Sequence, residues 1–408
     1  MRIVFLVGSF PAVSETFILN QITGLMDLGH EVLIFAGAGS YERVVHPVVV
    51  SRGLLKHVRY YHAKPRNWIV RVLCFLWHLP GAFRSAPDIV LRSLDVSRYG
   101  REALSLNLFF MTKAFLEVRD FDAVVAHFGA NGLVASRMKD LGVIRGKVVV
   151  FFHAIDLTAY PRRYGQDVYR HLFEQADLLL PVSDHAKDRL AALGCPENKM
   201  RIHRMGVALT PFRPKAPGAV FRIISVARFV DKKGLAYAID AVAELHRAGI
   251  PVEYTLVGDG PRYAELKERV RHSGMEGQVH FLGWQNAAEV LGRLYAADVL
   301  VAPSIQAENG DEEGIPVVLM EAMAAGVGVV TTPTGAIAEL VEDRQTGFLV
   351  PPQDAAALAG CLRAVWEHPE TIAPLLVRAR QAIETGHDIA RLNYGLQDLL
   401  QEVCCEKK

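Results

Sequence analysis

Short apolar runs alternate along the whole chain with longer stretches in which apolar residues recur every three or four positions. The apolar runs lie at residues 2–8, 31–37, 123–129, 147–154 and 177–183, and again at 221–227, 252–260, 279–283, 298–304, 327–332 and 347–352. Continuous apolar runs of this length indicate strands buried on both faces, and the stretches between them indicate amphipathic helices. The pattern predicts an α/β protein with parallel sheets that helices cover on both sides.

The alternation is broken once, by a segment rich in proline and glycine at 206–219. We predict two Rossmann-like, doubly wound domains, 1–205 and 220–382, with a hinge at 206–219 between them. A helical stretch of about 383–408 is long enough to pack back on the first domain. Doubly wound sheets bind ligands at the carboxyl ends of their strands, so we expect the two domains to face each other across a binding cleft.

The chain has 408 residues, about half of them apolar and 22% charged, which is enough for two buried cores. Its formal net charge of +1 conceals an asymmetry. Residues 1–210 carry 26 Lys and Arg against 18 Asp and Glu, a net +8, whereas residues 211–408 carry 19 against 26, a net −7. Much of the basic excess lies at 43–119, with 13 basic and 4 acidic residues. That stretch is either an ordinary solvated surface or a basic surface for phosphates or anionic lipid.

The most apolar window of the chain is WIVRVLCFLWHLP, from Trp68 to Pro80. Its 13 residues are too few to span a bilayer. Its tryptophans and the flanking basic residues are compatible with a helix that lies on a membrane surface, but a buried helix is the interpretation we favour. The chain starts without the pattern of a cleaved secretory signal, and its five cysteines show no pairing pattern. We therefore expect a cytoplasmic protein and leave peripheral contact with the inner membrane open.

Two glutamates stand eight positions apart in the stretch EEGIPVVLMEAMAAG. Pro316 suits the first turn of a helix, which places Glu313 in the approach loop and Glu321 inside the helix. Eight helical residues span about 12 Å, farther than the ~5 to 9.5 Å between the paired carboxyl groups of glycoside hydrolases. The free amides of Gly314 and Ile315 at the helix start would bind an anion between the carboxylates. We therefore predict a clamp on an elongated ligand with the layout of a sugar nucleotide.

The segment EGIPVVLMEAMAAGVGVV resembles the signature of retaining family-4 glycosyltransferases. Further segments resemble the same family, namely SVARFVDKKG, LVGDGPRYAEL, VHFLGW, ADVLVAPS and TGFLVPPQD. The N-terminal GSFPAVSETFILNQI and the stretch from VVAHFGANG to FFHAIDLT resemble more narrowly the bacterial exopolysaccharide glycosyltransferases of the colanic acid and amylovoran type. The resemblance covers the whole chain and implies a GT-B fold, with an acceptor-binding first domain and a second domain that binds the nucleotide sugar.

The resemblance implies roles for four charged residues of the second domain. Glu313 would contact hydroxyls of the donor sugar, and Glu321 would contact the ribose. Arg228 and Lys233 would neutralise the diphosphate, with Lys232 as the alternative to Lys233. Fixed cations suit this task because the leaving nucleoside diphosphate gains charge in the transition state.

Backbone positions complete the implied donor site. Gly8, which we place in the first turn from strand to helix, would let the backbone approach the donor phosphate, and Gly335 belongs to a second phosphate loop. Gly314 and Ile315 would present their amides, and Gly283 would lie at the base.

In the first domain the resemblance places His153 near the reacting sugar, as a catalytic residue. Asp156 and His127 are candidates for the acceptor side of the cleft, since each follows or ends a strand. Glu15 and Thr16 either face the acceptor or simply begin a helix.

The resemblance implies a retaining transfer of a hexose from a nucleoside diphosphate sugar, for which we favour UDP, to a lipid-diphosphate-linked oligosaccharide. Two alternatives stay open, a GT-B sugar-nucleotide epimerase and a non-catalytic subunit that binds a sugar nucleotide. We expect no cofactor and no nucleic-acid partner. Asp120 and Asp122 form the DxD pattern of metal-dependent glycosyltransferases, but they lead into a strand of the first domain, away from the donor residues, so we expect no metal site there.

Overall fold

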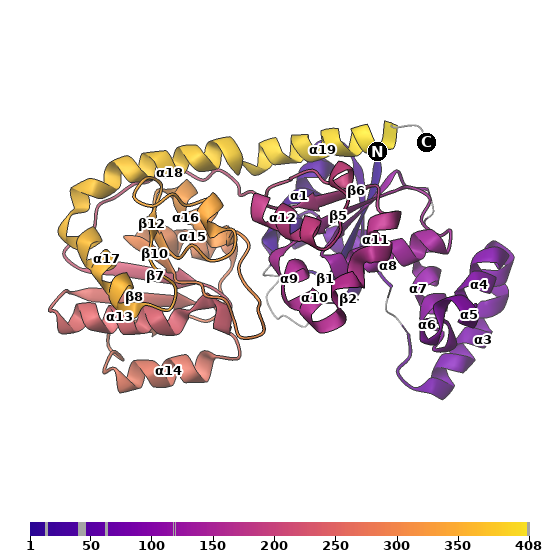
Figure 1. The fold of residues 1–408 in the computed structure, drawn as a ribbon, viewed down its shortest axis with the longest axis horizontal. Coiled ribbons are helices and arrows are strands. Elements are labelled where there is room, and N and C mark those ends of the chain that lie inside the picture. The colour runs from indigo at the N-terminus through magenta and orange to yellow at the C-terminus, as the bar shows by residue number, and fades with distance from the viewer. Residues whose placement is uncertain (13–14, 40–45, 62–63, 117, 119, 406–408) are drawn as a thin grey trace.

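Two six-stranded parallel sheets, one in each half of the chain, form the framework of the computed structural model (Figure 1). The structure describes residues 1–12, 15–39, 46–61, 64–116, 118 and 120–405. The strand orders are β3-β2-β1-β4-β5-β6 and β12-β11-β10-β7-β8-β9, so both sheets share one doubly wound topology. The predicted α/β class, with two Rossmann-like sheets, is confirmed.

The first sheet and its helices account for the chain up to residue 199. Its elements are β1 (Arg2–Phe10), α1 (Thr16–Asp27), β2 (Glu31–Gly39), α2 (Pro47–Ser51), η1 (Leu54–His57), β3 (Val58–Tyr60), α3 (Trp68–Ser85), α4 (Pro87–Ser93), α5 (Val96–Tyr99), α6 (Arg101–Leu104), α7 (Asn107–Leu116), β4 (Ala123–His127), α8 (Gly129–Asp140), β5 (Lys147–Phe152), α9 (Ala154–Leu157), α10 (Ala159–Tyr164), η2 (Gln166–Tyr169), α11 (Arg170–Gln175), β6 (Leu178–Pro181), α12 (Asp184–Ala192) and η3 (Glu197–Lys199).

The second sheet begins at residue 221 and is followed by three long helices. Its elements are β7 (Phe221–Val226), η4 (Asp231–Lys233), α13 (Leu235–Arg247), β8 (Val252–Val257), α14 (Tyr263–His272), β9 (Val279–Phe281), α15 (Ala287–Ala296), β10 (Val299–Ala302), α16 (Val317–Ala325), β11 (Gly328–Thr331), η5 (Ile337–Glu339), β12 (Phe348–Leu349), α17 (Ala355–Glu367), η6 (Pro369–Thr371), α18 (Ile372–Gly386) and α19 (Ile389–Cys405).

The apolar runs of the sequence form the strands at the centre of each sheet. Residues 3–7 of β1 and all of β4 are buried, because helices cover both faces of a parallel sheet. The chain changes direction between β1 and β4 in the first sheet and between β7 and β10 in the second. Ligands of doubly wound sheets bind at such points, beyond the carboxyl ends of the strands. Each half therefore has one expected binding edge.

Two details of the predicted site differ in the structure. Gly8 lies within β1 and not in the turn after it, because the strand continues to Phe10 and pairs Ser9 with Ala38 of β2. Pro316 is the N-cap of α16 and not part of its first turn. Its ψ of 126° is extended, and α16 begins at the next residue.

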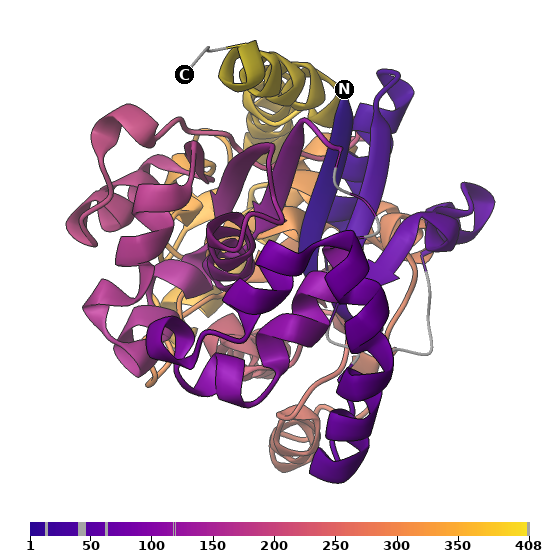
Figure 2. The same ribbon diagram turned by 90° about the vertical axis from the view of Figure 1, so that its right-hand side faces the viewer.

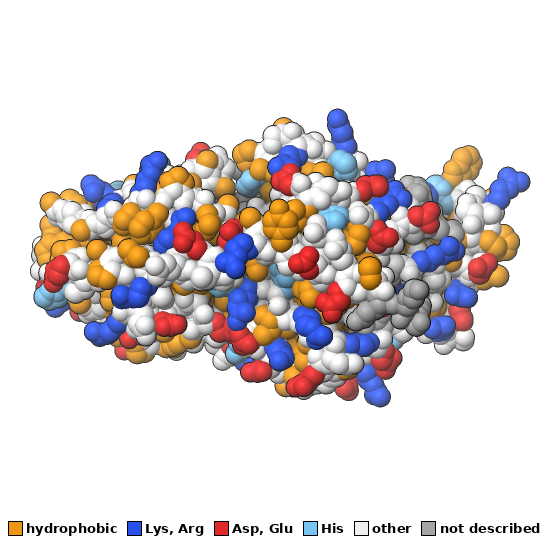
Figure 3. Space-filling model, turned by 90° about the horizontal axis from the view of Figure 1, so that it is seen from above, with side chains coloured by type: hydrophobic (Ala, Val, Ile, Leu, Met, Phe, Trp, Pro, Cys, Tyr) orange, Lys and Arg blue, Asp and Glu red, His pale blue; other side chains and the backbone are white. Residues whose placement is uncertain are grey.

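Helices α3 to α7 form a unit that projects from the first half, at the end of the molecule away from the second sheet (Figure 1). Figure 2, which faces this end, shows the unit in front of the first sheet. None of the 18 residues of α3 is buried. The prediction that the window from Trp68 to Pro80 forms a buried helix is therefore wrong, because only one side of α3 finds a partner. Hydrophobic and basic side chains share the surface at this end (Figure 3).

The chain passes between the halves twice. Residues 208–220 contain neither helix nor strand and lead into β7. Helices α18 and α19 then return along one side of the molecule to the first half (Figure 1). There Asn393 Nδ2 donates to the carbonyl of Asn20 at 3.3 Å, and Gln397 Oε1 lies 2.9 Å from His30 Nε2. The C-terminal helix thus packs on the half that holds the N-terminus.

Candidate functional site

An ion pair links two of the predicted donor residues at the carboxyl edge of the second sheet. Lys233 Nζ lies 3.0 Å from Glu313 Oε1, and Lys232 Nζ lies 3.7 Å from the same oxygen. Glu313 is only 7% exposed. Burial alone would raise the pKa of this carboxyl, but the charges of Lys233 and Lys232 hold the pKa below its usual value. Glu313 is therefore an ionised carboxylate whose charge the two lysines neutralise.

The two lysines have different partners. Lys232 Nζ lies 3.1 Å from Asp311 Oδ2 and donates to the carbonyl of Glu312 at 3.3 Å. The Nζ of Lys233 has Glu313 as its ion-pair partner in the described part of the chain. Lys232 is thus tied to the loop before α16, and Lys233 has the freer ammonium group. This geometry favours Lys233 over Lys232 as the contact to a diphosphate, and that assignment stays a prediction.

The backbone of Glu313 rests directly on Gly335. Gly335 has a φ of +61°, and a Cβ at this position would lie 1.9 Å from the carbonyl oxygen of Glu313. No side chain fits in that space. The loop after β11 therefore supports the carboxylate through contact between two backbones.

The start of α16 presents amides and a second carboxyl group. Within the described residues, the N–H groups of Gly314, Ile315 and Val317 have no acceptor, as expected at the start of a helix. The side chain of Glu321, one turn further into α16, has neither a hydrogen bond nor an ion pair among the described residues. Burial raises the pKa of Glu321 to about 7. This arrangement suits a bound anion at the amides and a hydroxyl donor at Glu321.

Two predicted donor residues lie apart from the ion pair. Arg228 follows β7 and is exposed, and its side chain has no hydrogen bond or ion pair within the described residues. Gly283 follows the edge strand β9 with a φ of +67°, and its carbonyl accepts from the N–H of Gly258 at 2.8 Å. A Cβ at Gly283 would meet no atom within 4 Å, so space lies open beside this backbone.

In the first half, the two predicted histidines are in contact. The Nδ1 of His127, at the end of β4, lies 3.3 Å from the Nε2 of His153, which follows β5. Burial lowers the pKa of His153 to about 3 and lowers the pKa of His127 as well, with the neighbouring His153 and His203 adding to the second shift. Both rings are therefore neutral at physiological pH, so one ring nitrogen donates to the other. The pair can form hydrogen bonds but supplies no positive charge.

The side chain of Asp156 holds the backbone of His153 in place. Its Oδ2 accepts from the backbone N–H of His153 at 2.9 Å, and burial raises the pKa of Asp156 to about 7. The carboxyl group fixes the turn that carries the histidine. This contact gives Asp156 a structural task beside the predicted acceptor-side one.

The remaining acceptor-side candidates lie around the end of β1. Glu15 lines a small hollow with Ser9 and His46, and Thr16 is the first residue of α1. Gly8 is exposed near the carboxyl end of β1, and a Cβ there would lie 3.9 Å from the side chain of Asn131. These residues share the binding edge of the first sheet with His127.

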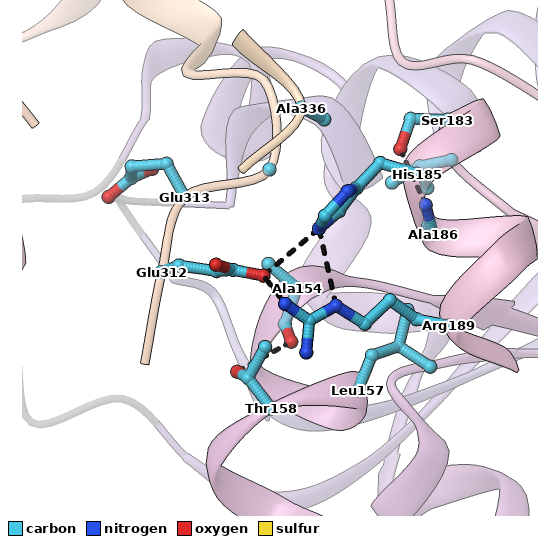
Figure 4. Close-up of a pocket in the computed structure, with 12 residues that line it drawn as sticks. Ala154, Leu157, Thr158, Ser183, His185, Ala186, Arg189, Glu312, Glu313 and Ala336 are labelled. Atoms are coloured by element: carbon cyan, nitrogen blue, oxygen red, sulfur yellow. Dashed lines mark hydrogen bonds and ion pairs between the residues drawn. The ribbon is translucent and has the colours of Figure 1, made fainter. Parts of the chain in front are cut away.

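The two halves meet in a hollow beside the Glu313 backbone (Figure 4). A Cβ at Gly314 would lie 3.8 Å from the Cβ of Ala154, the neighbour of His153. Across this hollow, Glu312 Oε1 lies 3.0 Å from His185 Nε2 and 2.9 Å from a guanidinium nitrogen of Arg189. Figure 4 shows the Glu312 carboxylate pointing to these two side chains and the Glu313 carboxylate pointing away from them. The structure thus brings residues 312–314, the loop before α16 that we call the donor loop, next to the turn that carries His153.

A second contact between the halves uses the start of α12. The carboxylate of Glu339 accepts from the backbone N–H groups of Asp184 and His185, at 2.9 and 2.7 Å. An acid at a helix N-terminus is favourable because the amides there are free. We name the contacts of Glu312 and Glu339 with α12 the interdomain clasp. Sequence reasoning missed it, since its only signal was a second glutamate before Glu313.

The DxD pattern lies at the opposite end of the first sheet. Asp122 Oδ2 accepts from the backbone N–H of Arg2 at 2.7 Å, and the carbonyl of Asp120 accepts from the Arg2 guanidinium at 2.9 Å. Both aspartates precede β4, whereas the binding edge lies after it. In the part of the chain that the structure describes, no group of three His, Cys, Asp or Glu side chains is arranged to hold a metal ion.

Two family models match the chain. "Glycosyl transferases group 1" matches residues 220–368, and "Glycosyl transferase 4-like domain" matches residues 14–206. The chain is 37% identical to the "Putative colanic acid biosynthesis glycosyltransferase WcaL" of Salmonella typhimurium, over 99% of this chain and 100% of that protein. It is 34% identical to the "Amylovoran biosynthesis glycosyltransferase AmsK" of Erwinia amylovora, over 94% of this chain and 95% of that protein.

Solved structures of the same architecture are similar along the full chain. Anabaena Alr3699/HepE in complex with UDP superimposes with a TM-score of 0.73 at 20% identity, covering 98% of this chain and 100% of that one. Sucrose-phosphate synthase from Thermosynechococcus elongatus has a TM-score of 0.74 at 19% identity and covers both chains completely. These likenesses confirm the predicted GT-B fold.

Proposed function

Because this chain belongs to the group 1 glycosyltransferases and has the GT-B fold, we propose that it transfers a hexose from a nucleoside diphosphate sugar in exopolysaccharide biosynthesis. The names of the two bacterial relatives support the pathway class. Alr3699/HepE has been solved with UDP and with UDP-glucose, which supports a UDP-sugar as the donor. The observation that carries the proposal is the contact between Lys233 and Glu313 beside the free amides of α16.

The donor would lie along the binding edge of the second half. Lys233 and Arg228 neutralise the diphosphate, with the amides of Gly314 and Ile315 beside them. Glu313 accepts hydroxyls of the sugar, and the base lies near Gly283 at the far end of the edge. The side chain of Glu321, whose raised pKa reflects burial without a partner, gains a hydrogen-bond donor when a ribose hydroxyl reaches it.

Glu313 and Lys233 neutralise each other, with 3.0 Å between Oε1 and Nζ. A diphosphate draws the ammonium group toward itself, and the sugar hydroxyls take its place at the carboxylate. The site therefore keeps both charges compensated before and after binding. Such compensation lowers the cost of holding charged groups in a buried site.

We propose that the reaction retains the anomeric configuration. The lysine contacts of Glu313 stabilise its ionised form and make it a weak nucleophile, and His153 is neutral. The acceptor hydroxyl would attack on the face of the departing nucleotide and pass its proton to the leaving phosphate oxygen. The protein contributes position and charge stabilisation, and Lys233 and Arg228 supply the charge that a metal ion supplies in other enzymes.

The acceptor would enter from the first half, past His127, His153 and the hollow beside Glu15. We propose a lipid-diphosphate-linked oligosaccharide at the inner face of the membrane. The basic excess at 43–119 supports attraction to an anionic surface. Within the described residues, no helix is both long and apolar enough to pass through a bilayer. Binding to anionic vesicles is expected to weaken as salt is raised, and binding that is absent at every salt concentration would contradict the attraction.

Closure of the two halves would complete the site. We propose a hinge at 206–219, with most of the rotation at its start. Residues 210–213 are held to the second half, since the carbonyls of Thr210 and Pro211 accept from Arg380 and Tyr295, both at 2.7 Å, and the N–H of Arg213 donates to Ala325. The free part of the hinge is therefore short.

A panel of UDP- and GDP-sugars tests the proposed function, with donor hydrolysis and protection against thermal unfolding as readouts. We expect one UDP-sugar to protect the protein and to be hydrolysed slowly. In Lys233→Ala, turnover should fall by about a hundredfold or more, because the leaving diphosphate loses its cation. Lys232→Ala is the matched control and should lose much less.

Equal turnover in Lys233→Ala and the unchanged protein would refute the assignment. Conversion of the sugar without release of nucleotide would identify an epimerase. Protection without any turnover, even with lipid-linked acceptor present, would identify a non-catalytic subunit.

A further inference from the structure

The outward face of α3 is a large apolar surface that no element in the described part of the chain covers. Trp77 is 83% exposed, Ile69 69% and Leu73 61%, and all three lie four residues apart along the helix. Residues with this spacing share one helix face. Other exposed apolar side chains flank this line of residues, namely Val70, Leu76 and Phe83. A polar face would be expected toward solvent on a surface helix, so the apolar outward face of α3 is unusual.

The rest of the unit holds α3 in a fixed orientation. Its inner face, including Phe75 and Leu79, packs on a small core of Val90, Phe109 and Phe110 that is separate from the cores of the two sheets. The rings of Phe75 and Phe109 meet edge to face with centroids 4.7 Å apart. The outward face is therefore presented by a packed scaffold and does not result from a loose helix.

The unit that carries this face is net basic. Residues 64–87 contain four basic residues and no acidic one, and residues 64–116 carry eight basic against three acidic residues, a net +5. Arg71 is held beside the helix start, where its Nε donates to the carbonyl of Pro65 at 2.9 Å. Figure 3 shows hydrophobic and basic side chains mixed at this end of the molecule. A surface that combines exposed apolar residues with net positive charge matches an anionic bilayer.

The charge also argues against a second copy of the chain as the occupant. Two such faces in contact would bring together two positive surfaces, and the resulting repulsion would oppose association. The headgroups of anionic lipids have the complementary charge. Trp77 suits the boundary between headgroups and acyl chains, because the indole is amphipathic.

We propose that α3 inserts its outward face into the interfacial region of an anionic bilayer and lies in the membrane plane. This goes beyond the electrostatic contact proposed above, because it assigns the contact to one helix and adds an apolar part that salt does not screen. The inference rests on the proposed function in one respect, which is that the membrane carries the lipid-linked acceptor. The unit lies at the end of the molecule away from the second sheet, so insertion leaves that half in water (Figure 1).

A variant with Trp77 as its single tryptophan tests the insertion directly. Trp68→Phe, Trp284→Phe and Trp366→Phe are combined in the full chain, and vesicles of phosphatidylcholine with about one third phosphatidylglycerol are added. We expect a blue shift of the Trp77 emission and quenching by brominated acyl chains. Part of the quenching should survive high salt, and pure phosphatidylcholine should give much less.

A second pair of variants identifies the face. Leu73→Gln combined with Trp77→Gln should reduce vesicle binding by about tenfold or more, because each loses apolar area that insertion would bury. Tyr394→Gln, at a side chain of α19 that is also exposed, is the control and should bind as before. Both variants should unfold at the unchanged temperature, since the altered side chains lie in water in the free protein.

Unquenched Trp77, or equal vesicle binding by the double variant and the unchanged protein, would overturn the proposal. A double variant that turns a dimer into a monomer, with vesicle binding unaltered, would instead make the face a contact between copies. Thermal protection by UDP-glucose is measured separately without vesicles. Absence of protection by every UDP-sugar of the panel would refute the proposed donor and leave the insertion result standing.

Discussion

Glu321 is a partly buried residue of α16 whose carboxyl group has no hydrogen bond or ion pair among the described residues. Its pKa of about 7 in the folded protein exceeds the ordinary value of 4.5. The folded state therefore binds a proton more tightly than the unfolded chain. Its contribution favours folding below the unfolded pKa and is lost as the pH rises through about 7. Such a cost at physiological pH is typical of a residue kept for a ligand.

The variant Glu321→Gln should separate stability from binding. At pH 8 it should be more stable than the unchanged protein, by on the order of 2 to 3 kcal/mol, because no charge is buried. At pH 4.5 the two should unfold at nearly equal temperatures. Protection by UDP-glucose should be weaker in the variant, because the ribose loses a charged acceptor. Thermal unfolding at both pH values, with and without UDP-glucose, measures all three.

The exposed Glu402 on α19 offers the control, since Glu402→Gln should shift neither stability nor protection. A Glu321→Gln protein that is less stable than its parent at pH 8 would mean that the carboxylate already has a stabilising partner.

Gly335 is the second residue whose identity the site requires. In Gly335→Ala the new methyl group would meet the carbonyl of Glu313, so that backbone must shift. We expect turnover to fall by about tenfold or more and stability to fall by about 1 to 3 kcal/mol. Steady-state kinetics and thermal unfolding measure the two effects. Gly360→Ala in α17 is the matched control. A Cβ there meets nothing, and alanine favours a helix, so both quantities should be kept.

Sequence reasoning could predict the chemical groups at the donor edge but not how they meet. Glu313 and Glu321 follow from one local segment, because the helix start between them is local. The contact between Lys233 and Glu313 joins residues 80 positions apart, and only the sheet order brings them together. Gly8 was misplaced because the end of a strand depends on its neighbour, here β2, and not on a glycine alone. The roles themselves stay predictions.

At the scale of elements, the interdomain clasp ties α12 to two loops of the second half. Glu339 accepts from the first two amides of α12. Glu312 contacts the side chain of His185 and that of Arg189, one turn further along the helix. One short helix thus meets acids from two different loops. The clasp stabilises the arrangement in which the donor loop and the turn at His153 are adjacent.

Loss of the clasp should open the molecule. In Glu312→Gln the bonds to His185 and Arg189 lose their charge, so the closed arrangement becomes less populated. The apparent Kd for a UDP-sugar should rise by about three- to tenfold, because binding must first restore closure. Small-angle scattering should show a larger radius of gyration in the variant without donor and an equal one with saturating donor.

Glu244→Gln is a control within the second half, where Glu244 lies 3.8 Å from Arg363 on the same half. It should change neither the radius nor the Kd. An unchanged radius in Glu312→Gln would show that other contacts hold the two halves together.

Elements were predictable where their surroundings are decided locally. The runs at 2–8 and 221–227 form β1 and β7, with bounds within two residues of the predicted ones, because an apolar run between helices has few alternative structures. Helix α3 shows the limit. Its composition indicates a helix with two apolar sides. Whether a second layer of helices covers the outer side cannot be predicted from the helix itself, and none does within the described residues.

At the scale of the whole molecule, the interdomain clasp brings acids of the second half against the first half. The clasp pairs basic side chains and amides of the first half with acids of the second. The charge asymmetry in the sequence was interpreted only as a surface for phosphates or lipid. The structure adds a second arrangement, in which Glu312 and Glu339 of the second half meet Arg189 and the first amides of α12. No single segment could have predicted this, since it depends on which surfaces meet.

The two passages of the chain between the halves also set the freedom of their motion. They run side by side, because Val207 bonds to both neighbours of residue 388: its N–H donates to the carbonyl of His387 at 2.9 Å, and its carbonyl accepts from Ile389 at 3.1 Å. A single flexible link would leave three axes of rotation. Two adjacent links joined by hydrogen bonds leave one easy axis, which passes through both. Every opening of this molecule should therefore trace nearly the same arc, so that a donor meets the same lysine and carboxylate each time the halves close.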